Sequence, residues 1–323
     1  MYNPTPFNLT PSLDAISTAR LSTYRQFFNP NSDEELYGIY CWNEMLSSNI
    51  LRLIGSVEVT LRNRFHTLLS QHAHTSQWAY TGTPDSNDWY SHAGLTGKSE
   101  DKVKAITHDS RYDRTLRTKV YVAKPYPISP NKVVSSMTFG FWAPLLDVGL
   151  PWKTLLPQIF PRHRYASVPN FWNQAAIGTI YERLNAVRDI RNRVAHFEPI
   201  WKIKDMPEEV RPTRGVTPRV ELPAPTNEAE ALVRLQTMYD RIVQLLYWMS
   251  ADRAADYRTT ELHQKSSYLL TQDGLDHFKS VSATQTYRMS TLTKSWGMKL
   301  VFQQRKPLQL THKGKVVGHF FPT

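Results

Sequence analysis

Residues 181–197, YERLNAVRDIRNRVAHF, decide the fold predicted for this chain. The stretch contains neither Gly nor Pro, and Pro199 follows closely, which predicts a helix that ends just beyond His196. At about 100° per residue, its apolar side chains fall on one side and form a core-facing stripe: Ala186, Val187, Ile190, Val194 and Phe197. We therefore expect this helix to pack against a helical body.

The opposite face of the predicted helix is polar. Four residues recur there at spacings of four, three and four: Asn185, Asp189, Asn192 and His196. Arg188 and Arg193 flank them, and Arg191 lies further round, within reach of His196 or of the same site in a partner subunit. Arginine holds phosphate in its planar fork and histidine moves protons near neutral pH, so the pattern R-N-x-x-x-H suits metal-free cleavage of RNA. The alternative is a solvated helix face with a histidine that the negative helix end favours.

Composition places the chain among globular proteins. Its 323 residues are 41% hydrophobic and 12% aromatic, enough for one large core or two modest ones. No stretch approaches the roughly 18 uninterrupted apolar residues of a membrane span, and the N-terminus lacks the charged and apolar regions of a secretion signal. The single cysteine, Cys41, excludes an intrachain disulfide and a cysteine-rich zinc site. We expect a cytoplasmic protein without a membrane partner. Because no carboxylate or histidine cluster has two-metal spacing, we expect no metal and no cofactor.

Positive charge is concentrated at the C-terminus. Residues 279–323 contain eight Lys and Arg and no Asp or Glu, so they hold +8 of the net charge of +11. Aromatic residues lie among these cations, as on surfaces that bind phosphates and stack bases. The RNA-binding candidates are therefore Arg188, Arg193, Lys299, Arg305, Lys306, Lys313 and Lys315. A basic tail that binds nothing in particular is the alternative, and charge alone does not distinguish RNA from DNA or an acidic protein.

A long helix is predicted over residues 34–71, after an N-terminal arm (1–33) with a short helix at about 13–28. Its apolar positions repeat at three and four, which is typical of a core-packed helix: Leu46, Ile50, Leu53, Val57, Leu61, Phe65 and Leu68. Glu58 and Arg62 lie four apart on another face, with Asn63 beside them. They form either a surface ion pair or the supporting part of a site on the 181–197 helix.

The remaining elements divide the chain into a helical domain (34–262) with an irregular insertion (72–130) and a basic C-terminal segment (263–323). Within the insertion, residues 98–119 are expected to form a polar helix. Further on we expect an aromatic core segment (133–142), a proline-rich loop (205–226), a helix (227–257) and short strands at 299–302, 308–311 and 316–321. The fold class predicted is mainly α, with a small basic β appendage.

Four segments, in their order and relative spacing, are similar to the bacterial abortive-infection (Abi-like) family of the HEPN superfamily: Tyr40–Asn43, Glu58–Asn63, Phe139–Trp142 and Arg191–Ile200. The resemblance spans about residues 35–250. It implies a HEPN-like helical bundle with the R-N-x-x-x-H helix at its centre and a composite active site between two copies of the chain. It also implies a metal-independent ribonuclease that acts as a toxin in anti-phage defence. Some relatives are restrained by a small non-coding RNA, which suits the basic tail. Members often carry a second histidine after the motif, where this chain has Phe197.

The expected reaction is attack of the RNA 2′-hydroxyl on the adjacent phosphate. His196 is the candidate general acid or base, Arg191 would stabilise the transition-state charge, and Asn192 would orient the imidazole or the phosphate. The candidate supporting residues are Glu58, Arg62, Asn63 and Asp189. The alternative is a non-catalytic RNA-binding protein that uses the same surfaces. A DNA-binding regulator is a weaker alternative, since no helix-turn-helix pattern lies near the basic residues.

Overall fold

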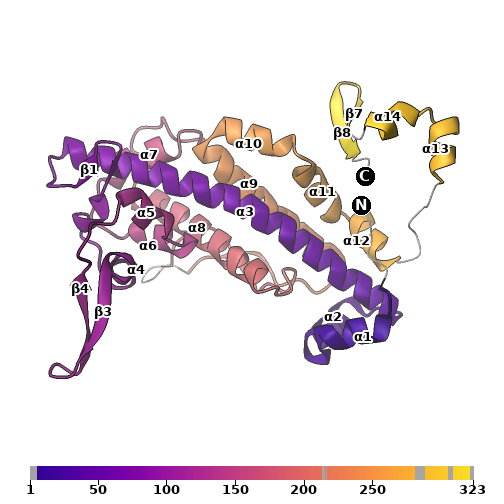
Figure 1. Ribbon diagram of the computed structural model, residues 1–323, viewed down its shortest axis with the longest axis horizontal. Coiled ribbons are helices and arrows are strands. Elements are labelled where there is room, and N and C mark those ends of the chain that lie inside the picture. Colours follow the sequence, from indigo (N-terminus) through magenta and orange to yellow (C-terminus); the bar gives the residue numbers. More distant parts are fainter. Residues whose placement is uncertain (1–5, 213–214, 216, 281–287, 305–307, 321–323) are drawn as a thin grey trace.

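One long helix, α3 (Asp33–Thr75), organises the molecule (Figure 1). The computed structural model describes residues 6–212, 215, 217–280, 288–304 and 308–320. The 43 residues of α3 extend about 65 Å at 1.5 Å per residue. The Ser32 hydroxyl caps the helix by accepting a hydrogen bond from the backbone N–H of Glu35 at 3.2 Å. The helix predicted over 34–71 is thus confirmed, and its apolar positions form the spine of the core.

The other helices of the body lie along α3, so the predicted mainly α fold is confirmed. They are α5 (Pro130–Ser135), α6 (Trp142–Leu145), α7 (Trp152–Ile159), α8 (Gln174–Ala195), α9 (Glu228–Met249), α10 (Ala251–Arg258), α11 (Glu261–Leu269) and α12 (Gln272–Lys279). The predicted 227–257 helix is present as α9 and α10, which meet at Ser250. Its core-facing apolar residues are buried: Leu232, Leu235, Met238, Ile242, Leu245 and Leu246.

The N-terminal arm folds against one end of α3. It contains two helices rather than the one expected, α1 (Leu9–Ile16) and α2 (Thr18–Phe28), because the chain turns at Ser17 with a φ of 83°. Tyr24 and Phe28 of α2 are buried. Their rings lie 5.5 Å and 4.9 Å from Trp201, in the segment after α8. The arm therefore holds the chain that leaves the R-N-x-x-x-H helix.

The aromatic segment 133–142 is part of the core, as predicted. It contains the end of α5, the 3₁₀ turn η2 (Phe139–Phe141) and the start of α6, and its apolar side chains are buried: Val133, Val134, Met137, Phe139, Phe141 and Trp142. The ring of Trp142 lies 5.4 Å from Phe65 of α3. Trp152 and Phe160 complete the cluster around Phe65.

The insertion differs from the expectation in its second half. It contains a short hairpin, β1 (Gly82–Thr83) and β2 (Ser86–Asn87), the turn η1 (Trp89–Ser91), and α4 (Gly97–Thr107). The helix expected over 98–119 ends at Thr107, and the chain continues as an antiparallel hairpin, β3 (His108–Asp113) and β4 (Thr118–Ala123). The Asp113 carboxylate accepts hydrogen bonds from the N–H groups of Thr115 and Leu116 and so fixes the tight turn. The hairpin projects from the body (Figure 1).

The helical body extends beyond residue 262, because α11 and α12 pack on α3. Trp42 of α3 donates its indole N–H to the carbonyl of Leu269 at 2.8 Å. At Gly38 a Cβ would lie 1.8 Å from the Phe278 carbonyl, so only glycine permits this approach of α12. The first part of the predicted C-terminal segment thus belongs to the body.

The described C-terminal residues after α12 form two short helices and a hairpin. These are α13 (Met289–Ser295), α14 (Lys299–Gln304), β7 (Leu308–His312) and β8 (Lys315–Phe320). The predicted strand at 299–302 is wrong, because so short an apolar run fits either a helix or a strand. The hairpin after residue 308 is confirmed. A further pair, β5 (Met206–Pro207) and β6 (Val220–Leu222), lies in the proline-rich loop. In the described part of the chain, no helix combines the length and apolarity needed to cross a membrane.

Candidate functional site at the end of α8

Arg191 and Asn192 of the R-N-x-x-x-H sequence lie in the last turns of α8, and His196 is the residue that directly follows the helix. Asn173 begins this helix by accepting hydrogen bonds from the N–H groups of Ala175 and Ala176. Val187, Ile190 and Val194 of the predicted apolar stripe are buried. Phe197 is not: its side chain is 59% exposed, because α8 ends at Ala195 and the chain turns with a φ of 53° at Phe197. The expectation that Phe197 faces the core is therefore wrong.

The turn that follows α8 is held by three other parts of the chain. Arg20 of α2 donates a hydrogen bond to the Phe197 carbonyl. Asn43 of α3, which is buried, accepts one from the backbone N–H of Ile200 at 3.0 Å. Arg193 of α8 pairs with Glu198 at 3.3 Å. These contacts hold the backbone that follows His196 in a defined position at the end of α8.

Replacing Asn43 with alanine should destabilise the protein. The buried N–H of Ile200 would lose its acceptor, at a cost of about 1–3 kcal/mol. Urea unfolding would measure this change in the free energy of unfolding. Ser48→Ala, at an exposed position of the same helix, is the matched control. Equal stability of the two variants would contradict the role assigned to Asn43.

The motif residues have no partners within the described part of one chain. Asn192 and His196 are exposed and Arg191 is half-buried, and none of their side chains makes a hydrogen bond or an ion pair there. The exposed Asp189 contacts its neighbour Arg188 at 2.9 Å. The polar stripe of α8 is therefore confirmed as a solvent-facing surface at its C-terminal end. Asn185 differs, because its Oδ1 is buried without a donor.

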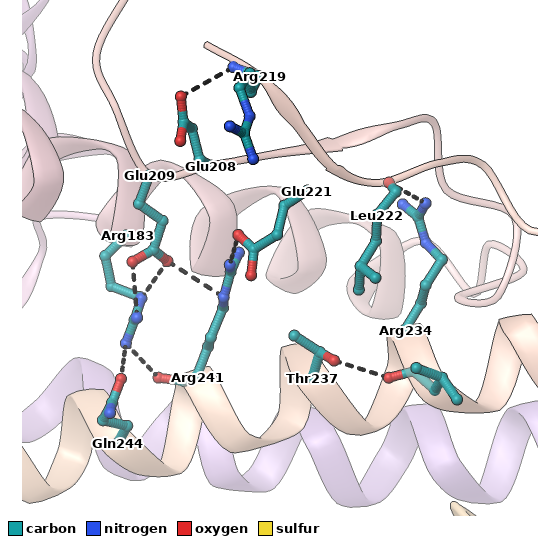
Figure 2. Close-up of polar contacts among 11 residues, drawn as sticks. Arg183, Glu208, Glu209, Arg219, Glu221, Leu222, Arg234, Thr237, Arg241 and Gln244 are labelled. Carbon is teal, nitrogen blue, oxygen red and sulfur yellow. Dashed lines mark hydrogen bonds and ion pairs between the residues drawn. The ribbon is translucent and has the colours of Figure 1, made fainter.

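A second arginine of α8 has a purely internal environment (Figure 2). The guanidinium of Arg183 forms a bidentate ion pair with Glu209, donates to Gln244 of α9 at 2.9 Å and donates to the Arg241 carbonyl at 3.1 Å. Arg241 in turn pairs with Glu221 at 2.6 Å. This network fastens the proline-rich loop to both α8 and α9 and fixes α8 in the bundle.

The predicted supporting residues on α3 do not contact the motif. Arg62 donates to the carbonyl of Ser135 in α5 at 2.7 Å. Asn63 is exposed and lies in a groove shared with Ser250 and Arg253, at the α9–α10 junction. Glu58 makes no hydrogen bond or ion pair with any described residue. Their supporting role therefore stays a prediction, because no contact among the described residues joins them to the motif.

The predicted RNA-binding cations lie in separate regions. Arg188 and Arg193 are both on α8, where Arg188 contacts Asp189 and Arg193 contacts Glu198 in the turn that follows. Lys299 and Lys313 are exposed on α14 and at the β7–β8 turn, away from α8 in Figure 1. Arg305, Lys306 and the side chain of Lys315 lie outside the described residues. The structure thus places only Arg188 and Arg193 near the motif.

A groove of about 670 Å³ lies beside the turn after α8. Phe27, Trp201, Arg193, Lys202 and Lys204 line it, so its wall combines aromatic and basic groups. Among the described residues, no group of three or more His, Cys, Asp and Glu side chains is arranged to hold a metal ion.

Sequence reasoning missed the residues that hold the turn, above all Arg20 and Asn43. Asn43 lies in a segment that supported the family resemblance, but nothing local shows that it binds a backbone N–H 157 positions later. Lys102 of α4 was also missed, although it lies next to Arg188 across Gly140.

These features define a mainly α protein whose R-N-x-x-x-H motif ends a central helix and faces solvent. Comparison with known families matches residues 12–202 to the family described as Abi-like protein. The match covers more than half of the chain, which therefore belongs to the Abi-like family. Neither a curated protein nor a solved structure matches the chain.

Proposed function

We propose that this protein is a metal-independent endoribonuclease of HEPN type that acts in abortive-infection defence, with Arg191, Asn192 and His196 as its catalytic residues. One observation carries the proposal. Of the arginines of α8, Arg183, Arg188 and Arg193 all bind carboxylates, whereas Arg191 makes no ion pair with any described residue. A half-buried arginine that has no internal partner, five positions before an exposed histidine, is available to a phosphate.

The proposed reaction needs two proton transfers. A base removes the proton of the RNA 2′-hydroxyl as its oxygen attacks the adjacent phosphorus. An acid protonates the 5′-oxygen as the P–O5′ bond breaks, which leaves a 2′,3′-cyclic phosphate and a 5′-hydroxyl. Arg191 stabilises the negative charge that grows on the phosphoryl oxygens, and Asn192 positions the phosphate or the imidazole.

One chain supplies one histidine to this site. No ring contact or hydrogen bond joins His196 to another histidine in the described residues. A homodimer in which the C-terminal ends of two α8 helices face each other would provide His196 of a second copy as the other proton-transfer group. The exposure of Asn192 and His196 supports this arrangement, because they are free to face a partner.

Cleavage should persist in EDTA, because no step of the proposed reaction uses a divalent ion. The assay is incubation of end-labelled RNA with purified protein in EDTA and, separately, with added Mg²⁺ or Mn²⁺. Equal rates are expected in all three conditions. Cleavage that appears only with a divalent ion would overturn the mechanism.

The second candidate function is RNA binding without cleavage. The basic, aromatic groove beside the turn favours it, and so do the exposed Lys299 and Lys313, which suit a small non-coding RNA partner. RNA that co-purifies with the protein and is never cut would favour this function over the nuclease.

A further inference from the structure

We propose that Lys98, Lys102 and Arg188 form a phosphate subsite that holds the RNA strand beside the R-N-x-x-x-H motif. The inference rests on the proposed function for the identity of its ligand. Gly140, in the turn η2, lies between Lys102 of α4 and Arg188 of α8. A Cβ built on Gly140 would lie 3.3 Å from Cδ of Arg188 and 3.6 Å from Nζ of Lys102. The aliphatic part of the Arg188 side chain and the ammonium group of Lys102 thus lie close together against Gly140.

The lysines of α4 lie on different faces of the helix and differ in whether they have a carboxylate partner. Ser99 and Val103 are buried, and Lys104 pairs with Glu100 one turn earlier. Lys98 and Lys102, four residues apart, share a different face. No carboxylate in the described chain pairs with Lys102. Glu100 of α4 therefore neutralises Lys104, whereas Lys98 and Lys102 lie close enough to Arg188 for their charges to interact.

The electrostatic environment of Lys102 is unfavourable without an anion. Burial, together with the charges of Arg188 and Lys98, lowers the pKa of its ammonium group. The Asp189 side chain is exposed and that of Arg188 is partly exposed, and ion pairs accessible to water contribute at most about 1 kcal/mol. A phosphodiester between Lys102 and Arg188 would relieve the repulsion, and the ammonium and guanidinium groups would both donate to its oxygens.

The subsite lies close to the R-N-x-x-x-H motif, because Arg188 is on the same helix. Arg188 precedes His196 by eight residues, which is about 12 Å along the helix axis. Beyond α4, the β3–β4 hairpin continues the basic surface, with five Lys and Arg against two Asp in residues 108–124. Tyr112 on this hairpin is 66% exposed, as in proteins that stack single-stranded bases. RNA bound at His196 would thus extend over the subsite toward the hairpin.

The test compares Lys102→Ala with Lys104→Ala, because these lysines lie on one helix but only Lys104 has a carboxylate partner. Binding of a short fluorescent single-stranded RNA, with a 2′-deoxy substitution at the cut site, is measured against salt concentration. We expect Lys102→Ala to weaken binding about tenfold and to reduce the salt slope by about one, with a smaller effect for Lys104→Ala. In cleavage assays, Lys102→Ala should raise KM and leave kcat nearly unchanged.

The outcomes separate the two proposals. Equal binding by the two variants, when the wild type binds and cleaves RNA, overturns the subsite and leaves the nuclease intact. Loss of affinity in Lys102→Ala with no cleavage by the wild type supports the subsite and contradicts the nuclease. Gly140→Ala, which places a methyl group against the Arg188 side chain and the Lys102 ammonium group, should weaken RNA binding while both charges remain. Unchanged binding by Gly140→Ala, with thermal unfolding like that of the wild type, counts against the subsite.

Discussion

Replacing His196 with alanine should reduce the rate of RNA cleavage by at least about 100-fold, because a positioned acid or base contributes about 10²–10⁴ in rate. The imidazole is exposed and has no partner in the described chain, so its loss should leave stability unchanged. RNA binding should also persist, because the neighbouring Arg188 and Arg191 remain. Single-turnover cleavage, RNA affinity and thermal unfolding measure the three properties.

The matched control for His196→Ala is His92→Ala, another exposed histidine, which follows η1 in the insertion. This variant should cleave RNA like the wild type. If the His196→Ala protein is folded and cleaves RNA at the wild-type rate, His196 is not a catalytic residue and the proposed mechanism is wrong. Equal losses in both histidine variants would likewise argue against a specific role for His196.

Replacing Arg183 with alanine should destabilise the protein by about 3–5 kcal/mol, the typical cost of removing one partner from a buried ion pair. Only 6% of the Arg183 side chain and 13% of the Glu209 side chain are exposed. Without Arg183, Glu209 keeps a single cation, Arg241, at 3.6 Å. The guanidinium also lies 4.5 Å from the ring of Trp248, and that contact would be lost.

Urea unfolding measures the change in free energy. Arg25→Ala is the matched control, because the pair of Arg25 with Asp33 is half exposed on both sides and should contribute at most about 1 kcal/mol. Arg183→Lys should fall between the alanine variant and the wild type, since an ammonium group cannot reproduce the two-pronged contact with Glu209. A cost below that of Arg25→Ala would show that the network in Figure 2 does not hold α8 in place.

Periodicity predicted α3, α8 and α9 well, because each buries a continuous apolar stripe. It failed where side chains face solvent. Residues 108–119 have too few buried positions to reveal a hairpin, so the polar helix expected there ends at Thr107. At the site, spacing correctly placed Asn192 and His196 on an exposed face. It did not reveal Arg20, Asn43 or Lys102, because the residues that they lie against are far away in the sequence.

The chemical identity of the RNA ends tests the central claim most directly. Wild-type protein would be incubated with a defined RNA in EDTA, and the fragments would be analysed by mass spectrometry. Attack by the 2′-hydroxyl predicts a 2′,3′-cyclic phosphate on one fragment and a 5′-hydroxyl on the other, with no cleavage at a site that carries 2′-deoxyribose. Fragments that end in a 3′-hydroxyl and a 5′-phosphate would instead show attack by water and would contradict the mechanism proposed for Arg191 and His196.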